Sequence, residues 1–125
     1  METKQKARYV RKIRRRYGFD EEWLVDPIGL SGGLALWWLD SIKVDILFSS
    51  SNIIHTRIDG GEFSAPEYIT FICRPPVEDD RCLCWQEITR ISKNITGSWL
   101  CLGDFNYILF SHEKLGGRPR AWCKI

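Results

Sequence analysis

The residues best suited to chemistry stand at the end of an apolar run, in the segment Trp99 to Asn106, which reads WLCLGDFN. Side chains two residues apart on an extended chain point the same way, so Asp104 and Asn106 would share one face while Phe105 turns back toward the core. A carboxylate in such a pair can orient or deprotonate a water molecule, and an amide can hydrogen-bond a phosphate oxygen without adding negative charge. Gly103 would let another backbone approach closely. An aspartate and an asparagine in an ordinary turn explain the same residues equally well.

The cysteines and histidines do not form a recognisable metal-binding pattern. The chain has five cysteines, an odd number without the spacing of a disulfide framework. Cys82 and Cys84 are too close in sequence for a zinc knuckle, and the two histidines supply no paired ligands. We expect His55, in an apolar strand, to be a partly buried structural residue and His112 to be an exposed loop side chain. The cysteine content and the lack of a secretory leader at the start lead us to expect an intracellular protein that is not secreted. The nucleus is one of the compartments that fit this expectation.

Size and composition indicate one folded unit. The 125 residues are 44% hydrophobic and 27% charged, which is typical of a soluble globular domain, and the six Trp and six Phe require a core. The longest apolar stretches are too short and too interrupted to span a bilayer, so we expect no membrane partner.

The spacing of apolar residues predicts two helices and several strands. A repeat of three or four residues predicts a helix from about Lys4 to Tyr17, with Ala7, Val10, Ile13 and Tyr17 on one side and the arginines on the other. A second helix is predicted from about Asp79 to Ser92, with Asp79 and Asp80 at the positive end of its dipole. Strands are predicted at Trp23–Val25, Leu34–Trp38, Ile42–Phe48 continuing through Ile53–Ile58, Tyr68–Cys73 and Ser98–Leu102. The first two of these strands should form a hairpin, and the order of elements predicts an α/β protein built on sheets.

The first helix allows two interpretations. Arg14, Arg15 and Arg16 lie in a strongly basic stretch, which could contact nucleic-acid phosphates with a salt-sensitive affinity independent of sequence. Alternatively, the basic face only keeps an amphipathic helix soluble while its apolar side packs on the sheet.

An ordered set of motifs resembles a known family. METK at Met1–Lys4, GLSGGLALWW at Gly29–Trp38, WLCLGDFNYIL from Trp99 and EKLGGRP at Glu113–Pro119 resemble the endonuclease domain of plant non-LTR (LINE-type) retrotransposons. That domain belongs to the endonuclease/exonuclease/phosphatase superfamily, together with deoxyribonuclease I and the apurinic/apyrimidinic endonucleases. The likeness covers essentially the whole chain. It implies part of a deoxyribonuclease I-like four-layer α/β/β/α sandwich with mainly antiparallel sheets.

The resemblance also implies a reaction and its residues. Asp104 matches the catalytic aspartate that handles the attacking water, and Asn106 matches the asparagine that holds the scissile phosphate. Glu2 matches the metal-binding glutamate, and Mg²⁺, with Mn²⁺ as the alternative, would be the cofactor for hydrolysis of a DNA phosphodiester. A glutamate beside an initiator methionine is also explained as a solvated terminal residue. GDFN by itself does not separate an endonuclease from a phosphatase, and DNA as partner follows from the retrotransposon-like motifs.

Three departures from the family pattern qualify these implications. The family has an asparagine-bearing strand before the METK position, and a further aspartate and a histidine downstream of GDFN, so residues 1–125 are expected to form a single partial domain. Its active-site tyrosine aligns with Cys73, and a thiol lacks the reach and hydrogen bond of a phenol. We therefore expect weak or absent turnover, with a noncatalytic nucleic-acid- or protein-binding remnant as the alternative function.

Overall fold

The protein is a mixed α/β structure, as predicted. The computed structural model describes residues 6–28, 33–73, 78–105 and 115. Its elements in chain order are α1 (Ala7–Arg16), β1 (Glu21–Val25), β2 (Leu34–Trp38), β3 (Ile42–Ser49), β4 (Ile53–Gly60), β5 (Glu67–Cys73), α2 (Glu78–Ser92) and β6 (Trp99–Asp104). No helix in this described part is long and apolar enough to cross a membrane.

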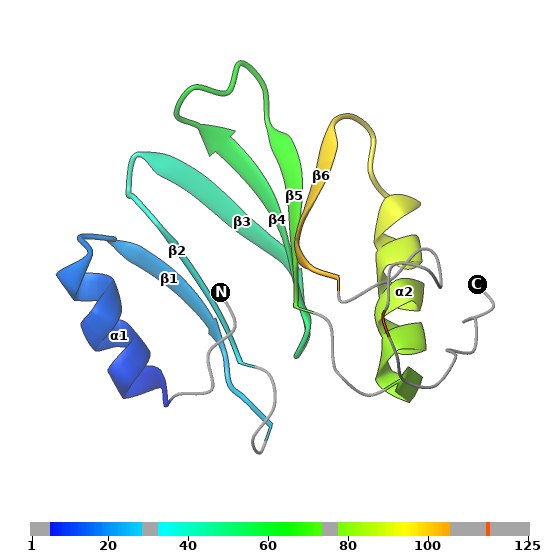
Figure 1. The fold of residues 1–125 in the computed structure, drawn as a ribbon. Helices are drawn as coiled ribbons and strands as arrows, with labels where there is room; N and C mark the ends of the chain where they lie inside the picture. The colour runs from blue at the N-terminus through cyan, green and yellow to red at the C-terminus, as the bar shows by residue number, and fades with distance from the viewer. Residues whose placement is uncertain (1–5, 29–32, 74–77, 106–114, 116–125) are drawn as a thin grey trace.

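The strands form two sheets. β1 and β2 pair as an antiparallel hairpin, which confirms the sequence prediction. The other four strands lie in the order β3-β4-β5-β6, antiparallel except for the parallel pair β5 and β6. A parallel pair needs a crossover, and α2 supplies it. Figure 1 shows α1 on the outer side of the two-stranded sheet and α2 beyond the four-stranded sheet, so the sheets lie between the helices.

The main core lies between the four-stranded sheet and α2. Its buried members are Ile53, Ile72, Cys84, Ile88 and Ile91. The three α2 members recur at helical spacing, so one face of the helix covers the sheet and contributes the apolar burial that stabilises this layer. The irregularity in β3 between Ile46 and Phe48 turns Phe48 toward this side, where it packs against the same cluster.

Two local predictions were wrong. Ile53–Ile58 does not continue β3, because the chain reverses before it and the backbone N–H of Ser50 donates to the carbonyl of Ile53 at 2.8 Å. Tyr17, predicted on the inner side of α1, is 71% exposed, since the helix ends at Arg16 and the chain turns away at Gly18, where φ is 76°. Val10 is the α1 side chain that is fully buried.

Candidate functional site

Asp104 is the last residue of β6, at the carboxyl end of the parallel β5–α2–β6 unit. The predicted strand therefore runs two residues further than Leu102, and the GDFN segment begins inside the strand. Asp104 is solvent-exposed, whereas Phe105 packs against the α2 core with its ring 6.1 Å from that of Trp85. This confirms that Phe105 turns back to the core. Ligands of α/β sheets commonly bind outside the carboxyl ends of parallel strands, which is where this carboxylate lies.

Gly103 makes the pairing that places Asp104. Its φ is 145°, and a Cβ at this position would lie 1.8 Å from the carbonyl oxygen of Ile72 on β5. Real side chains do not tolerate such a contact, so β6 can approach β5 this closely only with glycine here. The sequence prediction of a close backbone approach at Gly103 is confirmed.

Cys73 lies directly beside Asp104, because the two residues are register partners at the ends of β5 and β6. Asn52 holds the end of β5 from the other side: its carbonyl accepts from the Cys73 N–H at 2.8 Å, and its Nδ2 donates to the Cys73 carbonyl at 2.8 Å. Sequence reasoning missed this double clamp. The turn-forming run Ser50-Ser51-Asn52 was the available signal, since such residues bond to nearby backbone.

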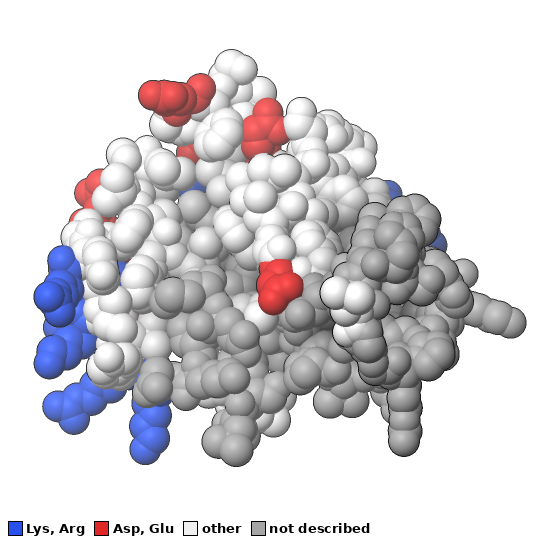
Figure 2. Space-filling view, in the orientation of Figure 1, with Lys and Arg blue, Asp and Glu red and all other residues white. Residues whose placement is uncertain are grey.

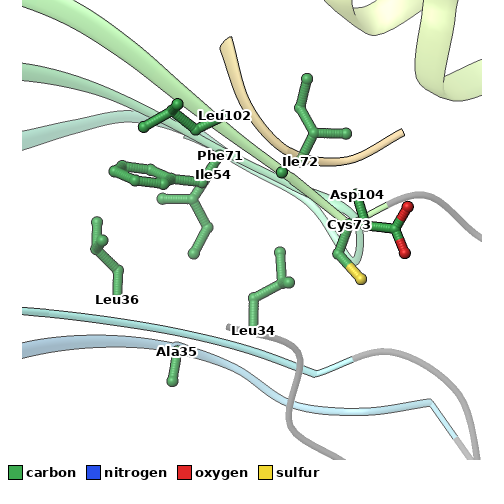
Figure 3. Close-up of a pocket in the computed structure, with 10 residues that line it drawn as sticks. Leu34, Ala35, Leu36, Ile54, Phe71, Ile72, Cys73, Leu102 and Asp104 are labelled. Carbon is green, nitrogen blue, oxygen red and sulfur yellow. The ribbon is translucent and has the colours of Figure 1, made fainter. Parts of the chain in front are cut away.

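A cavity of about 300 Å³ lies between the two sheets and ends at Cys73 and Asp104. Its other lining side chains are apolar and come from β2, β4, β5 and β6, among them Leu34, Ile54 and Phe71. Figure 3 shows Asp104 and Cys73 together at one end, with Leu34 and Leu36 of β2 facing Ile54 and Phe71 across the space between the sheets. The arrangement offers a charged, exposed edge above an apolar floor, so a polar ligand would contact the edge rather than the cavity interior.

The residues that the structure describes do not form a complete metal-binding site. Glu2 and Asn106 lie outside them, so their placement beside Asp104 stays a prediction. Among residues 6–28, 33–73, 78–105 and 115, no group of three or more His, Cys, Asp or Glu side chains is arranged to hold a metal ion. Asp104 supplies one carboxylate and Cys73 one thiol, which is not the all-oxygen set that Mg²⁺ prefers. His112 also lies outside the described residues.

His55 belongs to a buried polar network on the α2 side of the sheet. Its Nδ1 lies 2.8 Å from Thr70 Oγ1, which also accepts from the indole N–H of Trp99 at 2.8 Å. The imidazole stacks on Tyr68 with ring centroids 6.0 Å apart. His55 is only 6% exposed, which confirms the prediction of a structural histidine. The same burial raises the pKa of the nearby Cys101 thiol, against a smaller opposing hydrogen bond from Thr70.

Acid should destabilise the protein through His55. Burial lowers the pKa of this imidazole below its usual value of 6.5, so the unfolded chain binds a proton more readily than the folded one. The stability contributed by neutral His55 is present above about pH 6.5 and is lost as pH falls from there through the lower folded-state pKa. We expect the urea midpoint to fall between pH 7.5 and pH 5.5, and to fall less in a His55→Gln variant. An equal pH dependence in both proteins would contradict this role.

The described cysteines differ in oxidation state. Cys73, Cys84 and Cys101 do not form disulfides, whereas Cys82 on α2 is disulfide-bonded. The intracellular location stays a prediction.

The three arginines predicted to touch nucleic acid do not share one environment. Arg15 and Arg16 are exposed, as predicted, but Arg14 turns inward and its side chain is only 14% exposed. Its Nε lies 3.1 Å from Glu22 Oε2 in an ion pair, and its Nη1 donates to the carbonyls of Phe19 and Asp20. Arg14 therefore differs from the other two, because an acid on β1 holds it against the hairpin.

Arg14→Ala should destabilise the protein by about 2 kcal/mol, because it leaves the Glu22 carboxylate, 17% exposed, without its inner partner. Arg11 still contacts Glu22 Oε1 at 2.5 Å from the exposed side, which limits the loss. Arg15→Ala, one residue away and exposed, should change the free energy of unfolding by no more than about 0.5 kcal/mol. Urea denaturation of the two variants measures the difference, and equal values would show that the Glu22 pair contributes nothing.

Comparison with known proteins gave no match: no family model, no curated protein and no solved structure is similar to this chain at a significant level.

Proposed function

We propose that this chain derives from a metal-dependent endonuclease of the endonuclease/exonuclease/phosphatase superfamily, resembling those of plant LINE-type retrotransposons, and that it acts on DNA phosphodiesters. The observation that carries the proposal is the position of Asp104: an exposed carboxylate at the carboxyl end of a parallel βαβ unit, next to a glycine at which a Cβ would clash with the backbone of β5. The motif resemblance supplies the reaction class, and the deoxyribonuclease I-like four-layer sandwich is the fold that we propose with it.

The order of layers supports this fold. Along the chain, α1 and the β1–β2 hairpin precede the four-stranded sheet and α2, and Figure 1 shows the two helices outside the two sheets. The mainly antiparallel pairing with one parallel edge pair agrees with the mixed sheets of such a sandwich.

The chemistry proposed for Asp104 is that of a general base. Its carboxylate accepts a proton from a water molecule whose oxygen attacks phosphorus, while the bond from phosphorus to the leaving sugar oxygen breaks and that oxygen takes up a proton from solvent. Asn106 would hydrogen-bond a phosphate oxygen. The resemblance assigns Mg²⁺, with Glu2 as its ligand, and the described residues do not complete that site.

Low turnover is part of the proposal. Cys73 occupies the register position beside Asp104 where the family pattern calls for a tyrosine, and a thiol is a weak hydrogen-bond donor with shorter reach. Misplacement of a reacting group by about 1 Å can cost about a hundredfold in rate, so incomplete positioning has a large effect.

Nicking of supercoiled plasmid by the purified chain tests the proposal. We expect slow conversion to the open circle with Mg²⁺ or Mn²⁺ and none with EDTA. Hydrolysis of a phosphomonoester, but not of plasmid, would redirect the proposal to a phosphatase. Absence of both activities over a long incubation with excess protein would refute it.

A further inference from the structure

The outer face of α1 carries a stripe of cations that hydrolysis at Asp104 does not use. At about 100° per residue, Arg8, Arg11, Lys12 and Arg15 fall within a sector about 100° wide, and all four are exposed. No acidic residue occurs between Ala7 and Arg16, so nothing on the helix itself neutralises the stripe. Figure 2 shows a group of Lys and Arg side chains along the edge of the molecule where Figure 1 places α1.

Most of this charge is not used by the fold. Glu22 engages Arg11 and the inward-facing Arg14. Within the described part of the chain, no acidic side chain forms an ion pair with Arg8, Lys12 or Arg15. A charge that the fold needed would be paired or partly buried, as Arg14 is. These three residues therefore contribute little to stability and remain available to a partner.

The chemistry of the face favours a nucleic acid over a membrane. A helix that binds lipid inserts an apolar face, but the apolar side of α1 is already used, with Val10 buried. The residues that flank the stripe are Tyr9, which is 54% exposed, and Arg16. Arginine recognises phosphate through paired N–H donors, and an exposed aromatic ring can stack on a base.

We propose that the stripe binds the phosphate backbone of a nucleic acid without sequence preference, through its three members outside the Glu22 ion pairs, Arg8, Lys12 and Arg15. From Arg8 to Arg15 the helix rises about 10 Å, enough to reach more than one phosphate along a strand. The β1–β2 hairpin lies between α1 and the sheet that carries Asp104, so this surface is separate from the candidate catalytic edge (Figure 1). The stripe binds nucleic acid whether or not the chain hydrolyses it.

Fluorescence anisotropy with a labelled DNA duplex in EDTA measures this binding without catalysis. Three phosphate contacts predict that the logarithm of the association constant falls linearly with the logarithm of the salt concentration, with a slope of about −3. The triple variant Arg8→Ala, Lys12→Ala, Arg15→Ala should bind at least about tenfold more weakly at low salt, and its affinity should depend much less on salt. Each single variant should reduce the magnitude of the slope by about 1. Lys93→Ala is the matched control for Lys12→Ala, because Lys93 is an exposed lysine just past α2. It should leave both the affinity and the salt slope unchanged.

Two further measurements make the result decisive. Arg15→Lys, which keeps the charge, should retain most of the slope, and the urea midpoints of all these variants should match the wild type because the side chains are exposed. A slope unchanged in the triple variant would overturn the proposal. An equal loss of DNA affinity in Lys93→Ala would show that the overall charge of the protein attracts the DNA, and it would overturn the proposal. Binding to phosphatidylserine vesicles but not to DNA would assign the stripe to a membrane surface and would also overturn the proposal. None of these outcomes bears on the proposed hydrolysis, which would use a metal ion and Asp104.

Discussion

Gly103→Ala is expected to destabilise the protein by at least about 3 kcal/mol, because a methyl group there would meet the backbone of β5. The added Cβ would lie 1.8 Å from the Ile72 carbonyl oxygen and 2.7 Å from its carbonyl carbon. Backbone cannot swing aside as a side chain can, so β6 must separate from β5. The conformation at φ 145° adds about 1–3 kcal/mol of strain for any residue with a side chain.

Gly97→Ala provides the matched control. Gly97 has φ 134°, close to that of Gly103, but a Cβ there would meet nothing within 4 Å. This variant should show the backbone strain without the clash, so Gly103→Ala should lower the urea midpoint clearly more than Gly97→Ala. Tryptophan fluorescence can follow both transitions, since Trp85 and Trp99 pack against the α2 core. Equal effects would show that the close approach of β6 to β5 does not limit stability.

Asp104→Asn is expected to lower the rate of metal-dependent plasmid nicking by about a hundredfold or more, the usual contribution of a general base. Asparagine keeps the size of the side chain and its capacity to accept a hydrogen bond, but it cannot take a proton from water at neutral pH. Because Asp104 is exposed, the urea midpoint should change by little. The measurement compares initial nicking rates at equal protein concentration, with EDTA as the blank.

Asp59→Asn makes the same chemical change at the opposite end of the same sheet. Asp59 lies near the end of β4, away from the carboxyl ends of β5 and β6, and its substitution should leave nicking unaltered. Equal rates for wild type and Asp104→Asn would remove Asp104 from the chemistry. Equal losses in both variants would attribute the effect to net charge on DNA binding. Nicking by every variant alike, EDTA included, would identify a contaminating nuclease.

Local pattern was sufficient for most elements. The repeat that buries Val10 identified α1, the alternation along β3 identified a strand, and the apolar spacing through Ile88 and Ile91 identified α2, each within a few residues of its bounds. These predictions succeed because the period of apolar residues is set by local geometry, 3.6 for a helix and 2 for a strand. Phe105 follows from the same alternation, one step past Asp104.

The candidate site, by contrast, depends on contacts between segments far apart in the chain. The sequence by itself supplied the residue types, Asp104 after an apolar strand and a glycine before it, and it marked α1 as basic. Only the tertiary structure paired β5 with β6 and so put Cys73 beside Asp104, clamped the end of β5 with Asn52, and separated Arg14, which an acid on β1 holds inward, from the exposed arginines. The physical reason is that periodicity reports whether a side chain faces core or solvent, whereas a partner is chosen by which faces meet when distant segments pack.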